Sequence, residues 1–207
     1  MKFIGIILLL LTSIFLIACS ANQASNKISN SELENLASKY GGVYVFNEKF
    51  EKEITTKEKI RREAELAIVN ASKTDAEMRK NLKGFDAKYP QILSNGKKYY
   101  TRWIDYENQT GKKAEIPEVY INKIKEFIGD DFNKQKPELL MLYLYEDNGI
   151  AIPITVRASY TYVKTKYGLF GDEGRGVKLS KQNFVTRTSR SEFHIINGKF
   201  ERVGKDK

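Results

Sequence analysis

The sequence is poor in the side chains that most often form cross-links or metal sites. Its 207 residues include one cysteine, Cys19, and one histidine, His194. A single cysteine excludes an internal disulfide and a thiolate zinc cluster. A single histidine excludes metal sites and catalytic mechanisms that need two imidazoles. We therefore expect neither a metal nor a cofactor.

The lone histidine is a poor candidate for catalysis. It lies between Phe193 and Ile195 in a predicted strand, where neighbouring side chains point to opposite faces. A surface or sheet-pairing role is therefore favoured over catalysis. Serine hydrolase chemistry is disfavoured as well, because a serine nucleophile usually needs a histidine base.

The last third of the chain is poor in acidic residues. Residues 151–207 carry 12 Lys and Arg against five Asp and Glu, whereas residues 19–150 carry 22 against 21. Such an excess creates an attractive field for anions, although the strand pattern does not place all the cations on one face. The candidate anion- or partner-binding residues are Arg157, Arg175, Lys178, Lys181, Arg187 and Arg190.

The first residues have the pattern of an export signal. Lys2 precedes an apolar stretch of about 16 residues, shorter than the roughly 20 that a spanning helix needs. The stretch ends in Leu16-Ile17-Ala18-Cys19, which resembles the lipobox of bacterial lipoproteins. The resemblance implies that residues 1–18 are removed and that lipid on Cys19 tethers the chain to a membrane.

The residues after the cysteine indicate a short tether. Ser20, rather than aspartate, resembles the pattern of lipoproteins sorted to the outer membrane, in a cell that has one. Small polar residues follow, so residues 19–30 are predicted to be flexible. Residues 31–207 are expected to form a single α+β domain in the cell envelope.

Capping signals predict helices before residue 130. Four segments match the capping box, and they begin at Ser29, Ser31, Thr55 and Thr74. Residues 56–85 are predicted as two helices, or as one helix broken near Ser72. Pro117 and Gly129 bound a further helix.

Turn signals predict strands after residue 137. Asn148-Gly149 and Asn197-Gly198 lie between apolar runs and predict hairpins with type I′ turns. Helices followed by an antiparallel meander give the α+β class. We expect a curved antiparallel sheet over the early helices, and this order resembles the NTF2-like and cystatin-like folds by element order alone.

Two other segments are candidates for binding. Residues 99–106 contain four aromatic side chains and are predicted to form a strand. One face of it is a candidate ligand wall of Tyr100, Arg102 and Tyr106, with core packing as the default alternative. Residues 168–176 contain four glycines and are predicted to lie in a loop of roughly 15 residues, either a binding loop or a plain connection.

Charged clusters have less specific interpretations. Adjacent acids at 130–131, 146–147 and 172–173 are candidates for a carboxylate pair, although such pairs in turns are usually only solvated. One predicted helix carries a run of cations with acidic residues four positions away, and these cations are Lys57, Lys59, Arg61 and Arg62. We expect them to pair internally on a solvated helix face, as Glu58 with Arg62 and Lys59 with Glu63.

Three classes of function fit this sequence. The first is a lipid-anchored, non-catalytic binding or accessory protein of the cell envelope, whose basic C-terminal third meets an anionic component or an acidic protein. The second is an immunity, exclusion or inhibitor lipoprotein that caps a partner protein. The third is an envelope hydrolase with a carboxylate pair. Nucleic acid is not expected as a partner, because no recognition motif is found.

Overall fold

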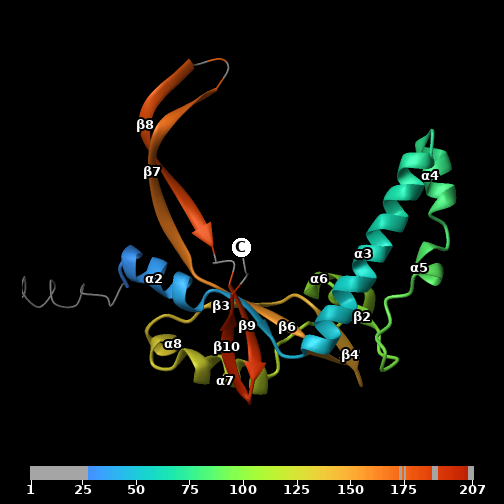
Figure 1. Ribbon diagram of the computed structural model, residues 1–207, viewed down its shortest axis with the longest axis horizontal. Helices are drawn as coiled ribbons and strands as arrows, with labels where there is room; N and C mark the ends of the chain where they lie inside the picture. The colour runs from blue at the N-terminus through green and yellow to red at the C-terminus, as the bar shows by residue number, and fades with distance from the viewer. Residues whose placement is uncertain (1–27, 173, 175, 188–190, 205–207) are drawn as a thin grey trace, which may run out of the picture.

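The computed structural model describes residues 28–172, 174, 176–187 and 191–204. Within these residues the α+β class is confirmed, with most helices before residue 130 and strands after 137 (Figure 1). The signal peptide, Cys19 and most of the tether lie outside the described residues. Over the described ranges, no helix has the length and apolar character needed to span a bilayer.

The largest sheet has five strands in the order β10-β9-β1-β6-β3. Neighbouring strands are antiparallel except β1 and β9, which run parallel. The early strand β1 therefore lies between strands from the end of the chain. The five strands are β1 (Gly42–Val45), β3 (Glu138–Met141), β6 (Thr155–Ser159), β9 (Ser191–Ile196) and β10 (Lys199–Val203).

One face of this sheet carries the main core. Tyr44 of β1 stacks on Phe193 of β9 with ring centroids 4.7 Å apart, and Phe200 meets Tyr44 edge-on at 5.0 Å. Aromatic pairs at these distances add to the stability from area burial. Side chains of four helices complete the core. These helices are α2 (Asn30–Tyr40), α6 (Trp103–Thr110), α7 (Glu118–Ile128) and α8 (Asp131–Lys134).

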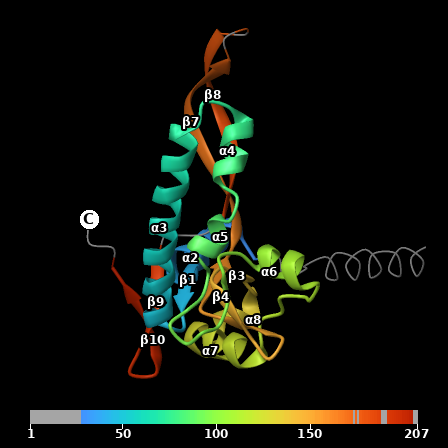
Figure 2. The same cartoon turned by 90° about the vertical axis from the view of Figure 1, so that its right-hand side faces the viewer.

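A second, smaller sheet supports the longest helix, α3 (Glu48–Ala71). Its strands follow the order β2-β4-β5. Ile54 of α3 is buried here together with Leu93, Tyr99 and Ile154. Ile54 lies in the second turn of α3, so most of the helix extends beyond the body (Figure 2). The strands are β2 (Tyr99–Tyr100), β4 (Leu144–Asp147) and β5 (Ile150–Pro153).

Three of the predicted helix starts are confirmed. Ser29 begins α2 with a complete capping box, and Thr74 caps α4 (Asp75–Asn81). Helix α7 follows Pro117 and ends before Gly129. The predicted break is also confirmed, because α3 ends at its C-cap, Ser72.

The predicted helix start at Thr55 is wrong. Helix α3 begins seven residues earlier, where the side chain of Asn47 accepts a hydrogen bond of 3.0 Å from the Phe50 amide. Thr55 lies inside the helix, and its hydroxyl donates to Glu51 one turn before it. A capping sequence starts a helix only where no upstream cap has already started it.

Both predicted Asn-Gly hairpin turns are confirmed. Asn148 and Gly149 have φ values of 48° and 79°, and Asn197 and Gly198 have 51° and 81°. Two consecutive residues with positive φ are typical of the type I′ turn, whose twist matches that of the flanking strands. The turns join β4 to β5 and β9 to β10.

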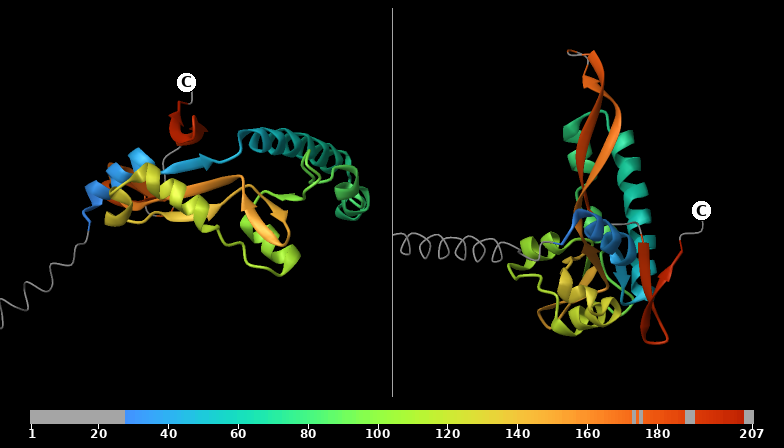
Figure 3. Two further views of the ribbon diagram at one scale, coloured as in Figure 1. Left: turned by 90° about the horizontal axis from the view of Figure 1, so that it is seen from below. Right: turned by 90° about the vertical axis from the view of Figure 1, so that its left-hand side faces the viewer.

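Two arms project from the same side of the body (Figures 1 and 3). The helical arm consists of the outer part of α3, α4 and the short helix α5 (Phe85–Lys88). The hairpin arm is a two-stranded sheet of β7 (Thr161–Asp172) and β8 (Gly176–Arg187). The arms are well separated in Figure 1.

Candidate binding surface on the hairpin arm

The glycine-rich segment forms the end of the hairpin arm and is not a long loop. Strands β7 and β8 pair continuously as far as Asp172 and Gly176, which leaves residues 173–175 as the connection. The predicted loop of roughly 15 residues is therefore wrong. A Cβ atom on Gly171 would lie 2.0 Å from the carbonyl oxygen of Gly176. The absence of a side chain at Gly171 thus permits the close approach of the two strands near the tip.

The strand register sorts the side chains of the arm into two faces. Cross-strand partners and alternate residues share a face, so odd-numbered residues lie on one face and even-numbered residues on the other. The odd-numbered face, called the apolar face, carries six large apolar side chains that are 40% to 79% exposed. The six residues are Val163, Tyr167, Leu169, Val177, Leu179 and Val185. The same face also carries Lys181 and the hydrogen-bonded pair Thr165 and Asn183, which separate Val163 and Val185 from the other four residues. Clusters of exposed apolar side chains are typical of interaction sites.

The even-numbered face, called the basic face, carries Lys164, Lys166 and Lys178 with two phenylalanines. The rings of Phe170 and Phe184 lie 5.8 Å apart, and the Lys166 ammonium lies 5.6 Å from the centre of the Phe184 ring. Cations over aromatic rings are attracted by the negative face of the ring. Between residues 161 and 187 the sequence has six Lys and Arg against two acids, Asp172 and Glu173. The arm therefore carries a net positive charge that attracts anions.

The foot of the hairpin arm is fixed to α2. The Asn30 side chain donates to the Val163 carbonyl oxygen and accepts from the Val163 amide, both at 2.7 Å. Lys164 lies 3.6 Å from Glu34 in an exposed ion pair. The side chain of Asn30 thus bonds the backbone of β7 at its open edge, and the start of the described chain lies beside the foot (Figure 1).

The predicted basic residues do not form one patch. Lys178 lies on the basic face, whereas Lys181 lies on the apolar face, with its ammonium 5.8 Å from the centre of the Tyr167 ring. Arg187 is exposed at the foot of the arm. Arg157 lies on β6 in the body. The other two predicted residues, Arg175 and Arg190, lie outside the described residues.

The predicted aromatic strand ends after two residues. Residues 99–100 form β2, and α6 (Trp103–Thr110) follows. Tyr100 and Tyr106 are buried in the main core and meet edge-on at 5.3 Å. Arg102 is exposed, and it donates to both carboxylate oxygens of Asp105 at 2.8 and 2.6 Å. Tertiary packing of the tyrosines has overridden the strand propensity of the segment.

A groove on the open face of the five-stranded sheet brings together two of the predicted residues. It has a volume of about 540 Å³ and is lined by Arg102 and Arg157, with apolar residues such as Val43 and Leu140. This volume suits a small ligand. However, the carboxylate of Asp105 already neutralises Arg102, which leaves the groove with a weaker attraction for anions than the hairpin arm has.

The adjacent acids are engaged by lysines rather than aligned across a cleft. Asp147 lies 2.7 Å from Lys97, and Glu146 lies 3.5 Å from Lys112. Hydrogen bonds from Lys134 and Tyr40 lower the pKa of Asp131. The third pair, Asp172 and Glu173, lies at the tip of the hairpin arm, where the structure does not describe these two side chains. Ion pairing keeps a carboxylate charged, whereas a general acid needs a raised pKa.

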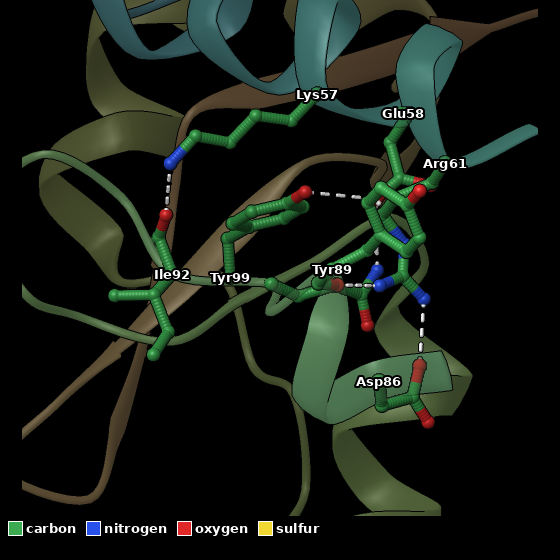
Figure 4. A network of polar contacts seen from close by, with 8 residues as sticks. Lys57, Glu58, Arg61, Asp86, Tyr89, Ile92 and Tyr99 are labelled. Atoms are coloured by element: carbon green, nitrogen blue, oxygen red, sulfur yellow. Dashed lines mark hydrogen bonds and ion pairs between the residues drawn. The ribbon is translucent and has the colours of Figure 1, made fainter. Parts of the chain in front are cut away.

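The cations of α3 pair differently from the prediction (Figure 4). Arg61, whose side chain is 14% exposed, donates to the carbonyl oxygen of Tyr89 and forms an ion pair of 2.8 Å with Asp86. Glu58 accepts hydrogen bonds from Tyr99 and Gln91, both at 2.9 Å. The network joins α3 to residues 86–99, so this run is a structural joint of the helical arm and not merely a solvated face.

His194 lies at a sheet-pairing position on β9, opposite Val45 of β1 and Glu201 of β10. Its ring nitrogens lie 4.0 Å from Glu48 and 3.9 Å from Glu192. Across the described parts of the chain, no three His, Cys, Asp or Glu side chains are grouped so as to hold a metal ion.

Comparison with known proteins finds no match among family models, curated proteins or solved structures. The resemblance to the NTF2-like and cystatin-like folds therefore has no support beyond element order.

Sequence reasoning missed the apolar face. The signal was present, because Tyr167 and Leu169 lie on either side of Gly168, and Val177 and Leu179 lie on either side of Lys178. Alternation of this kind predicts a strand with one apolar face. The four glycines instead favoured a loop.

Proposed function

We propose that this protein is a lipid-anchored, non-catalytic binding protein of the bacterial cell envelope, which holds an anionic envelope component with its hairpin arm. The lipobox-like residues 16–19 support the anchor. The charge of the exposed hairpin arm supports the anionic partner. The observation that carries the proposal is the projecting arm, whose residues 161–187 have six Lys and Arg against two Asp and Glu.

Binding by this arm requires no cleft. A two-stranded arm that stands clear of the body presents both faces and an open edge to a partner. Its cations raise the rate of encounter with an anion, and its exposed apolar side chains supply contact area. A protein that acts as an accessory or carrier in the envelope needs such a contact and no reaction centre.

The second candidate is an immunity, exclusion or inhibitor lipoprotein that caps a partner protein. The apolar face of the arm favours it, because exposed apolar residues are typical of protein contacts. For the envelope hydrolase, the ion-paired acids offer no comparable support, and it stays a prediction from the sequence alone.

The anchor is tested by Cys19→Ala in the full-length protein. We expect the variant to accumulate as an unprocessed precursor that takes up no labelled fatty acid, because the thiol that accepts the lipid is lost. Serine at position 20 is kept, so sorting signals after the cysteine are unchanged. Normal labelling of the variant would disprove the anchor.

The binding surface is tested by reversing Lys166, Lys178 and Lys181 to Glu. Each lysine near an anionic surface contributes about 1 kcal/mol, so loss of the three weakens binding to anionic envelope extract by about 100-fold. Binding of the wild type should also weaken as salt rises. The melting temperature should change little, because exposed charges contribute little to stability.

A matched reversal on the helical arm provides the control. The cations Lys59, Arg62 and Lys80 are exposed, and their reversal changes the net charge by the same amount. This variant should retain most of the binding. If the two variants bind equally well, or if the affinity of the wild type does not depend on salt, the cations of the hairpin arm serve only solubility.

A further inference from the structure

The apolar face of the hairpin arm has a composition that suits a lipid interface. Its outer half combines Tyr167 with the branched aliphatic side chains of Leu169, Val177 and Leu179, and the pair Thr165 and Asn183 separates this part from the foot. Lys164, Lys166 and Lys178 lie on the opposite face, whereas Lys181 lies on the apolar face itself, beside the Tyr167 ring. Amphipathic elements that lie in the plane of an anionic bilayer also combine one apolar face with lysines on the polar side.

Lysine geometry allows both faces to contribute at such a surface. The arm is a single two-stranded layer, so a lysine of the basic face is separated from the apolar face by only the backbone. Long lysine side chains turn around an edge and place the ammonium at the headgroups while their stems cover apolar surface. The cations and the apolar face can thus engage one surface together.

The attachment of the arm brings it close to the anchored end of the chain. Asn30 is bonded to Val163 at the foot, and Asn30 is 11 residues from Cys19. Eleven residues span at most about 40 Å. The arm has 12 residues in each strand, which rise about 40 Å along its length. A chain anchored at Cys19 therefore keeps the whole arm within reach of the anchoring membrane.

We infer that the apolar face of the hairpin arm lies in the headgroup region of an anionic lipid bilayer, as a second contact with the membrane to which Cys19 tethers the chain. The inference rests on the proposed anchor and names the anionic partner as lipid. Charge favours this occupant over a second copy of the chain, because the chain without residues 1–18 carries 34 Lys and Arg against 26 Asp and Glu, a net charge of +8, and its copies repel one another. The two contacts together hold the body in one orientation on the membrane.

The single cysteine makes a direct test available. In the lipidated protein Cys19 is blocked, so Leu179→Cys supplies a free thiol on the apolar face for an environment-sensitive dye. Leu179 is 79% exposed, so its replacement leaves the fold intact. Ser180→Cys places the same dye one residue away on the basic face. Both proteins are reconstituted into phosphatidylglycerol vesicles that contain nitroxide-labelled lipid.

We expect a blue shift and several-fold stronger nitroxide quenching at position 179 than at position 180. The difference should shrink in phosphatidylcholine vesicles and after reversal of Lys166, Lys178 and Lys181 to Glu. Equally weak quenching at both positions in phosphatidylglycerol would overturn the inference. If salt-sensitive binding to envelope extract persists in that case, the proposed function stands, and crosslinking from position 179 to an envelope protein would identify a protein partner instead.

Discussion

The two projecting arms use similar charged residues in opposite ways. In the helical arm, Arg61 and Glu58 are held by hydrogen bonds to the segment that folds back along α3. In the hairpin arm, Lys166 and Lys181 contact only aromatic rings among the described residues. A cation that bonds its own chain contributes to stability, whereas an exposed cation can meet a partner.

The largest expected effect on stability is in the helical arm, from Arg61→Ala. The change removes the donor to the Tyr89 carbonyl oxygen and the partner of Asp86. The exposed Asp86 carboxylate contributes little, whereas a part-buried carbonyl oxygen that loses its donor lowers the free energy of unfolding by about 1 to 3 kcal/mol. Urea denaturation measures this change.

The matched control is Arg62→Ala, the exposed neighbour in the same helix. Its effect should stay within about 0.5 kcal/mol, as for other surface changes. Equal losses in the two variants would show that the helical arm is not held by the network of Figure 4.

A smaller effect is expected from Asn30→Ala at the foot of the hairpin arm. The substitution removes both hydrogen bonds to Val163, and because both are exposed to solvent, each contributes about 0.5 kcal/mol, the low end of the usual range. Hydrogen exchange of the Val163 amide should accelerate, while exchange in the helical arm should stay unchanged. A protected Val163 amide in the variant would contradict the proposed joint.

The smallest effect concerns alkaline pH and Tyr99. Burial and the hydrogen bond to Glu58 raise the pKa of Tyr99 above its ordinary value of 10.0. The folded state therefore binds this proton more tightly than the unfolded state does. Its contribution to the free energy of unfolding is fully present below pH 10 and is lost as the pH rises above 10 toward the pKa of the folded state. The pH dependence of the melting temperature above pH 10 measures this effect.

Tyr99→Phe isolates this contribution from the other buried tyrosines. The variant should be less stable at neutral pH, because Glu58 loses a donor, but it should lose less stability than the wild type above pH 10. Parallel curves for the two proteins would mean that Tyr99 titrates alike in the folded and unfolded states.

The sequence predicted those parts of the fold that depend on near neighbours. The capping boxes at Ser29 and Thr74 and the turns at Asn148 and Asn197 are confirmed, because each is stabilised by bonds or dihedral angles within a few residues. The α+β class followed from the order of these local signals. The excess of basic residues in the last third was also predicted from composition. Its distribution over the two faces of the hairpin arm was not.

Tertiary structure decided the features that depend on residues far apart in the chain. The parallel pairing of β1 with β9 joins segments nearly 150 residues apart, and no local pattern specifies it. Tyr100 and Tyr106 are in the core because their packing partners lie elsewhere in the chain. Arg61 became a structural joint only when residues 86–89 folded back beside α3. The glycines of residues 168–176 were compatible with a loop or with closely paired strands, and the continuous pairing of β7 with β8 selected the hairpin arm.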